Sequence, residues 1–127
     1  NRMSHMSIYR TQLKGITTSF LIKAINDFIK TQEGMRIDNN YYARGEKFDI
    51  AVVSRLLPRG MAFSIERGCL VIKGDAWNQE EEFERLRNLI PQFIKAKVVA
   101  ATTRAAHPNA KMQMKTTQHE VILEVCI

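Results

Sequence analysis

Hydrophobic and polar residues alternate in several short segments of this 127-residue chain. The clearest alternation covers Met61–Glu66, and a second apolar segment, Cys69–Ile72, follows after Arg67 and Gly68. A period of two residues is typical of a half-buried β-strand. Two such segments joined by a short turn that contains glycine predict a β-hairpin.

Two other segments carry apolar residues at three- and four-residue spacing, which is the period of an amphipathic helix. Their apolar stripes span Leu21–Ile29 and Phe83–Ala101. The residues that precede them can cap a helix: Thr17 or Thr18 in the first case, and Asn78 in the second. Pro91 interrupts the second stripe, so this segment is expected either to kink or to continue as a second helix with Pro91 in its first turn.

Four further segments have strand-like patterns, and a fifth is a short strand or a loop. The four are Met6–Lys14, Phe48–Val53, Lys111–Lys115 and Glu120–Ile127, and the fifth is Met35–Ala43. The sequence therefore predicts an α+β fold: one antiparallel or mixed sheet of about four to six strands, with two helices packed on one face, ferredoxin-like in general architecture. Residues 1–127 are expected to form a single globular domain, because the length is ordinary and no linker interrupts it.

The last predicted strand is apolar on both of its faces. Val121, Leu123 and Val125 alternate with Ile122 and Cys126. A strand of this kind should be covered on both sides. The helices cover one side, and a second copy of the chain is a common cover for the other. The pattern therefore predicts a homodimer through the sheet, unless this strand is central and the Met61–Glu66 hairpin curls over it.

The chain carries an excess of positive charge. Nineteen Lys and Arg against thirteen Asp and Glu give a net charge of +6, which favours contact with nucleic acid or another acidic surface. No run of five basic residues exists, so an ordinary solvated surface is the other interpretation. Two groups of residues are predicted to bind nucleic acid. Tyr41, Tyr42 and Arg44 can stack on bases and bind phosphate, and Arg55, Arg59 and Arg67 lie near hairpin ends.

Residues that would build a catalytic or metal site are sparse in the sequence. His5, His107 and His119 are too far apart to form a local ligand pair, and no C-x-x-C pair, phosphate-binding loop or nucleophile elbow occurs. We therefore predict no metal, cofactor or catalytic residue. The least implausible acid for a small enzyme is Asp49 or Asp75, since both lie in strand-rich apolar segments. An Asp just past a strand more often caps a turn or a helix.

Two cysteines, Cys69 and Cys126, lie in apolar strand segments. This pattern is typical of buried, reduced cysteines in a cytosolic or stromal compartment. A disulfide between the two cysteines is the alternative, because strands distant in sequence can be neighbours in a sheet. The chain shows no signal peptide and no apolar run of about 18 residues. We therefore predict a protein of the cytoplasm or plastid stroma that does not contact the membrane.

The segment Met3–Lys14 resembles the start of a small-protein family of cyanobacteria and red-algal plastids, the conserved hypothetical chloroplast reading frame thirty-five family. Phe48-Asp49-Ile50 resembles its Tyr-Asp-Ile strand, and the segment that ends in Asp75-Ala76-Trp77 resembles its strand ending in Asp-Trp-Trp. Glu82–Val99 corresponds in position to its long helix. The family's helix carries Tyr-Ala-Tyr-His where this chain has Phe93-Ile94-Lys95-Ala96, so no role of that Tyr or His carries over. The resemblance implies a small soluble α+β protein of unknown function.

The function class that we predict is a non-enzymatic accessory or interaction module. No nucleophile, metal cluster or phosphate loop can be assembled from local sequence. An RNA- or DNA-binding protein with a basic sheet or hairpin surface is the first alternative, and a small enzyme is the second. The predicted partners are another protein or a second copy of the chain, with nucleic acid as the alternative.

Overall fold

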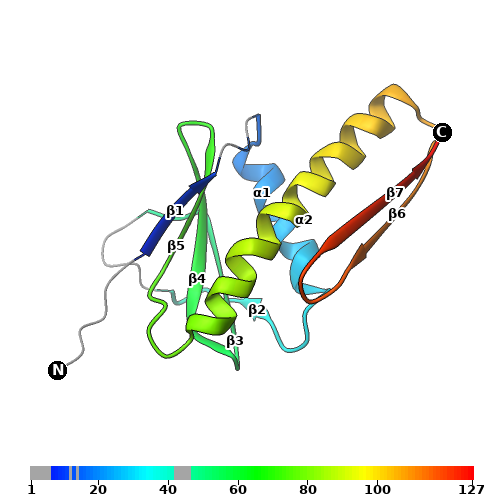
Figure 1. Cartoon of the computed structure of the whole chain (residues 1–127). Helices are drawn as coiled ribbons and strands as arrows, with labels where there is room; N and C mark the ends of the chain where they lie inside the picture. The colour runs from blue at the N-terminus through cyan, green and yellow to red at the C-terminus, as the bar shows by residue number, and fades with distance from the viewer. Residues whose placement is uncertain (1–6, 12, 14, 42–46) are drawn as a thin grey trace.

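The computed structural model describes residues 7–11, 13, 15–41 and 47–127. Within them the elements follow in the order β1 (Ser7–Thr11), α1 (Thr18–Ile29), β2 (Arg36–Ile37), β3 (Ile50–Ser54), β4 (Leu57–Glu66), β5 (Cys69–Gly74), α2 (Glu80–Ala106), β6 (Lys111–Thr116) and β7 (Val121–Cys126). Figure 1 shows both helices on the same side of the sheet that contains β1 to β5.

The described strands form two separate sheets. Five of them pair antiparallel in the order β1-β5-β4-β3-β2, and β6 pairs only with β7. The predicted class, an α+β fold with two helices on one face of an antiparallel sheet, is confirmed. In detail β2 to β5 form a simple meander, which differs from the split β-α-β units of a ferredoxin-like fold. Arg67 and Gly68 both have positive φ in the β4–β5 turn, as a two-residue hairpin requires.

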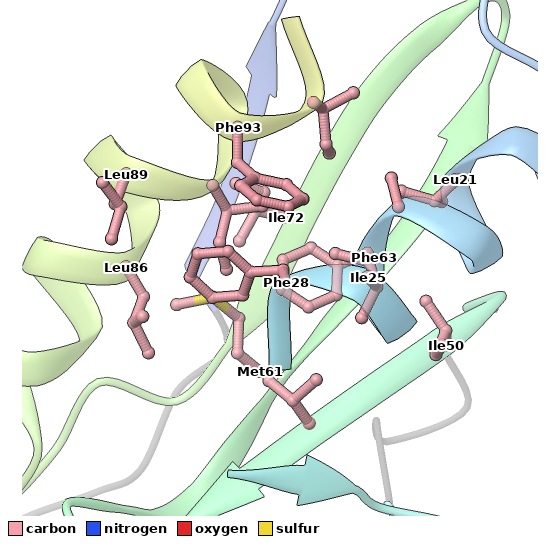
Figure 2. Close-up of a cluster of buried hydrophobic side chains, with 14 of the residues drawn as sticks. Leu21, Ile25, Phe28, Ile50, Met61, Phe63, Ile72, Leu86, Leu89 and Phe93 are labelled. Carbon is pink, nitrogen blue, oxygen red and sulfur yellow. The ribbon is translucent and has the colours of Figure 1, made fainter. Parts of the chain in front are cut away.

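The core lies between the helices and the five-stranded sheet. Figure 2 shows side chains of α1, α2, β3, β4 and β5 converging there. Phe28 of α1 is fully buried and meets Phe93 of α2 edge to face, with ring centroids 5.2 Å apart. Phe83, at the other end of the same stripe, is also buried. Burial of Phe28 and Phe83 confirms that the two apolar stripes are the faces that pack on the sheet.

The beginnings of the two helices differ from each other. The Thr17 hydroxyl accepts a hydrogen bond from the Phe20 N–H at 3.0 Å, so Thr17 caps α1 as expected. In α2 the predicted cap is wrong, because Asn78 adopts a positive φ of 61° and Gln79 occupies the cap position. The Gln79 side chain does not cap the helix. It is buried and hydrogen-bonds β4 and the β5–α2 connection instead.

Helix α2 is continuous through Pro91. The proline removes one backbone hydrogen bond, which is unfavourable inside a helix. Ile90, Phe93 and Ile94 on either side of it are buried in the core, and this packing holds the helix together across the proline. Of the two expectations for this segment, the break into two helices is therefore not observed.

The segment after β3 contains Pro58 and Gly60, residue types that often end a strand. It instead begins β4, and the pairing with β3 shifts register between Val52 and Ser54. Gly60 has a φ of +75°, and a Cβ there would stand 3.0 Å from the Val52 carbonyl oxygen and the Tyr41 ring. Glycine therefore permits a β-bulge at this point, and the strand continues past it.

The opposite face of the five-stranded sheet is covered at its centre. Ala51, Ala62 and Val71 are no more than 1% exposed, although they lie outside the core between the sheet and the helices. The connection between β2 and β3 contacts this side, since the Lys73 ammonium group donates to the Lys47 carbonyl at 2.8 Å. This face therefore needs no second copy of the chain as cover and offers no open stacking platform at its centre.

The C-terminal strands do not join the main sheet. Helix α2 has 27 residues, which corresponds to about 40 Å, so its second half extends beyond the sheet. Hairpin β6–β7 folds back along α2, as Figure 1 shows, and its turn reaches Arg85 in the first half of the helix. We call residues 95–106 of α2 together with β6 and β7 the arm. None of the helices in the described part of the chain is long and apolar enough to cross a membrane.

An ion pair between the helices predicts a dependence of stability on pH. The Lys97 ammonium of α2 lies 2.9 Å from the Asp27 carboxylate of α1, and this hydrogen bond lowers the pKa of Asp27 below its ordinary 3.8. A carboxyl group whose pKa is lowered by folding stabilises the protein above its unfolded pKa, and that contribution is lost as the pH falls through the folded pKa. Both partners are partly exposed, so the contribution at neutral pH is about 1 kcal/mol or less.

We expect Asp27→Asn to lower the free energy of unfolding by about that amount at pH 7. The difference from the natural chain should shrink as the pH falls below about 4 and vanish below the folded-state pKa of Asp27, where both chains are uncharged at this position. Urea titrations at several pH values measure it, with Glu33→Gln, an exposed carboxylate beyond the end of α1, as the control. An Asp27→Asn effect of the same size at every pH would contradict the ion-pair explanation.

Candidate interaction surface

A shallow apolar groove runs between α2 and β7 on the arm. Its volume is about 360 Å³, and its lining comes from one helix face and alternate residues of the strand: Gln92, Lys95, Ala96 and Val99, and Val121, Leu123 and Val125. Val99 is 43% exposed and Val125 is 39% exposed. Two aliphatic side chains of neighbouring elements therefore line the same groove and are still partly accessible to solvent.

The backbone of β7 has unused hydrogen-bonding groups beside this groove. In an antiparallel pair, opposing residues alternate between exchanging both backbone hydrogen bonds and exchanging none. The Thr117 N–H donates to the Glu120 carbonyl at 2.9 Å, which fixes the phase of this alternation. The N–H and C=O groups of Val121, Leu123 and Val125 therefore point away from β6. No described strand pairs with them.

The other edge of the hairpin carries charges that discourage pairing. Strand β6 has exposed Lys111 and Lys115, and neither forms an ion pair within the described residues. Lysines on an edge strand are a common protection against the addition of another strand. Strand β7 has no lysine, and its only charged residue is Glu124. The apolar and accessible edge of the hairpin is therefore that of β7.

Those predicted nucleic-acid residues that the structure describes do not come together into one surface. Arg55 precedes β4 and Arg67 follows it, so the strand of 10 residues places them about 30 Å apart. The Arg59 guanidinium lies 4.7 Å above the Trp77 ring and 3.3 Å from the Asp75 carboxylate. Tyr42 and Arg44 lie outside the described residues.

Tyr41 forms part of the folded structure beside β4. Its ring meets Phe48 edge to face at 5.3 Å and lies against Gly60. Burial, with the nearby Asp38 and Asp75 charges, raises the pKa of Tyr41 to about 12. Its ring therefore helps to cover the sheet.

Both acids considered for catalysis hold the backbone in place. The Asp49 carboxylate accepts a hydrogen bond from the Ile65 N–H at 2.9 Å. The Asp75 carboxylate accepts one from the Trp77 N–H at 3.0 Å, which is the turn-capping role that was favoured for it. Over the described ranges, no group of three or more His, Cys, Asp or Glu side chains could hold a metal ion. These contacts account for Asp49 and Asp75 as structural residues.

The start of α2 borders a wider polar cleft of about 800 Å³, and Arg85 is one of the residues that line it. Its guanidinium forms two hydrogen bonds to the Glu82 carboxylate, at 2.8 and 2.9 Å. It also donates to the Gln118 carbonyl and to the Gln32 side chain, each at 2.9 Å. Arg85 thus ties the β6–β7 turn to the end of α1, and this part of the cleft fixes the arm to the rest of the molecule.

The two cysteines are free and lie on different sheets. Cys69 begins β5 and is half-buried, whereas Cys126 ends β7 and is exposed. The expectation that both cysteines are buried is therefore wrong for Cys126. Its side chain lies on the solvent face of a two-stranded sheet, where no helix covers it.

Sequence reasoning identified the residues of β7 but placed the strand in the wrong sheet. The accessible edge and the contribution of Val99 to the groove were missed. The signal for a separate hairpin is local, because Lys111–Lys115 and Glu120–Ile127 are joined by a turn of only a few polar residues.

Comparisons of this chain with family models, curated proteins and solved structures found no match.

Proposed function

We propose that this protein is a non-enzymatic accessory module that binds another protein chain through the β7 edge of its arm. The observation that carries the proposal is the exposed apolar groove beside a strand edge whose backbone groups are unpaired within the described residues. An added strand satisfies such groups, and pockets for alternate side chains provide specificity. The groove beside Val125 supplies a pocket of this kind.

Affinity capture from an extract of the native host tests this proposal with two matched variants. Val125 and Ile122 are exposed to similar extents, 39% and 41%, but lie on opposite faces of β7. We expect Val125→Lys to lose the captured proteins and Ile122→Lys to retain them, at unchanged melting temperatures. Equal capture by both variants and by the natural chain would contradict a role for the groove.

Nucleic-acid binding is the second candidate, and the arm also provides its best support. Between residues 85 and 119 the chain contains no Asp or Glu, and exposed Lys95, Lys111 and Lys115 lie on the arm. If these lysines bind phosphates, affinity for single-stranded RNA falls steeply with salt. Neutralising the three lysines together should then weaken binding more than neutralising Arg55, Arg59 and Arg67 does.

The family and the compartment are also proposals. The family resemblance rests on the sequence alone, in the segments that form β3, that end β5 and continue to Asp75 and Trp77, and that form α2. Two free cysteines support a reducing compartment such as the cytoplasm or the plastid stroma. Measurement of the redox state of Cys126 in the native host checks the second point.

A further inference from the structure

We infer that the chain bound at the β7 edge is a second copy of this protein, and that the two β7 strands pair antiparallel with Leu123 opposite Leu123 of the second copy. This inference rests on the proposed function, since it names the partner of the same edge. A two-fold axis perpendicular to the sheet makes two copies of one strand antiparallel and gives both copies the same contacts. The result is a four-stranded sheet in the order β6-β7-β7-β6.

The hydrogen-bonding phase of β7 restricts the register. Only Val121, Leu123 and Val125 present outward backbone groups within β7, so each must face another member of this set in the second copy. With Leu123 opposite itself, Val121 faces Val125 twice, and all three residues of each copy exchange backbone bonds. A shift by two residues in either direction leaves Val121 or Val125 of each strand without a partner from this set.

Charge selects the same register. On the outer face of β7, Glu120, Ile122, Glu124 and Cys126 follow one another. Leu123 opposite itself places Glu124 beside Ile122 of the second copy and Glu120 beside Cys126. A shift in one direction places Glu124 opposite Glu124, and a shift in the other places it opposite Glu120. Like charges directly opposite each other destabilise a sheet, so the symmetric register about Leu123 is favoured over both neighbouring registers.

The same register buries the exposed apolar residues of the arm. The side chains of Val121, Leu123 and Val125 lie on the groove side of the strand. The incoming strand presents these same residues on that side and brings its own α2 with Ala96 and Val99. The grooves of the two copies then form one shared apolar layer, which accounts for the exposure of Val99 and Val125 in the single chain.

Cysteine cross-linking tests the register. In a chain with Cys69→Ser and Cys126→Ser, we expect Leu123→Cys to form a covalent dimer under mild oxidation, because hydrogen-bonded antiparallel partners have Cα atoms about 5.5 Å apart. Val121→Cys alone and Val125→Cys alone should not link to themselves. A mixture of these two variants should link to each other, and distinct tags on the two chains identify the product. Self-linking of Val121→Cys or Val125→Cys at the rate of Leu123→Cys would overturn the register.

Light scattering with the two lysine variants provides an independent test that needs no cross-link. In this register Ile122→Lys places an ammonium group beside Glu124 of the second copy, so its dimer should persist. Val125→Lys places a charge in the shared apolar layer, and its dissociation constant should rise at least about tenfold. Loss of the dimer in both variants, or in neither, would overturn the proposed pairing.

These experiments separate the second copy from other partners. If the natural chain is a monomer and Leu123→Cys does not link, but Val125→Lys loses captured proteins that Ile122→Lys retains, then the second copy is refuted and the interaction module stands. If capture is also unaffected by Val125→Lys, both proposals fail.

Discussion

Replacing Phe28 with alanine is expected to lower the free energy of unfolding by about 3–5 kcal/mol. Phe28 is fully buried on α1 and meets Phe93 of α2 edge to face. Figure 2 shows its ring among side chains that come from both helices and the sheet. Truncation removes these contacts and leaves a cavity where the two helices and the sheet meet.

Chemical denaturation of the purified variant measures this effect, and Val99→Ala is the matched control on α2. Val99 is 43% exposed, so its truncation in the single chain should cost well under about 1 kcal/mol. If Phe28→Ala cost no more than Val99→Ala, the helices would not pack on the sheet as described.

The second large effect is expected at Gln79, where truncation should cost about 2–4 kcal/mol. The Gln79 side chain is 4% exposed. Its amide oxygen accepts from the Arg59 N–H at 2.8 Å, and its amide nitrogen donates to the carbonyls of Gly60 at 3.2 Å and Asp75 at 3.0 Å. This one side chain satisfies backbone groups at the bulge of β4 and in the connection to α2. Removing it takes a partner from three backbone groups at once.

Two variants distinguish hydrogen bonding from packing at this position. Gln79→Met preserves most of the volume and removes the hydrogen bonds, so it should lose nearly as much stability as Gln79→Ala. Gln92→Ala is the control, because the exposed Gln92 amide also donates to backbone carbonyls, at 3.2 and 3.5 Å. Full stability of Gln79→Met would show that only the space filled by the side chain matters.

The sequence was informative wherever a local pattern determines the structure. The period of the stripes at Leu21–Ile29 and Phe83–Ala101 predicted both helices and their buried faces, because periodicity reports directly which side meets the core. The Arg67-Gly68 turn was equally clear, since a two-residue hairpin needs positive φ at both positions.

Features that depend on distant partners were not predicted. Pro58 and Gly60 suggested the end of a strand, but the pairing of β4 with both β3 and β5 carries the strand past them. Nothing in the local sequence marks Gln79 as buried, because two of its three backbone partners, Arg59 and Gly60, lie 20 and 19 residues away. The apolar residues of β7 predicted contact with another chain, which stays a prediction, and their separation from the main sheet follows from the length of α2.

Hydrogen exchange of the backbone amides of β7, measured by NMR at rising protein concentration, tests the central claim most directly. The amides of Ile122 and Glu124 face β6 and should be protected at every concentration. The amides of Val121, Leu123 and Val125 should exchange rapidly in dilute protein and become protected as the 14.6 kDa chain associates. Rapid exchange of these three amides at every concentration, and also after the proteins captured from the host are added, would contradict binding at the β7 edge.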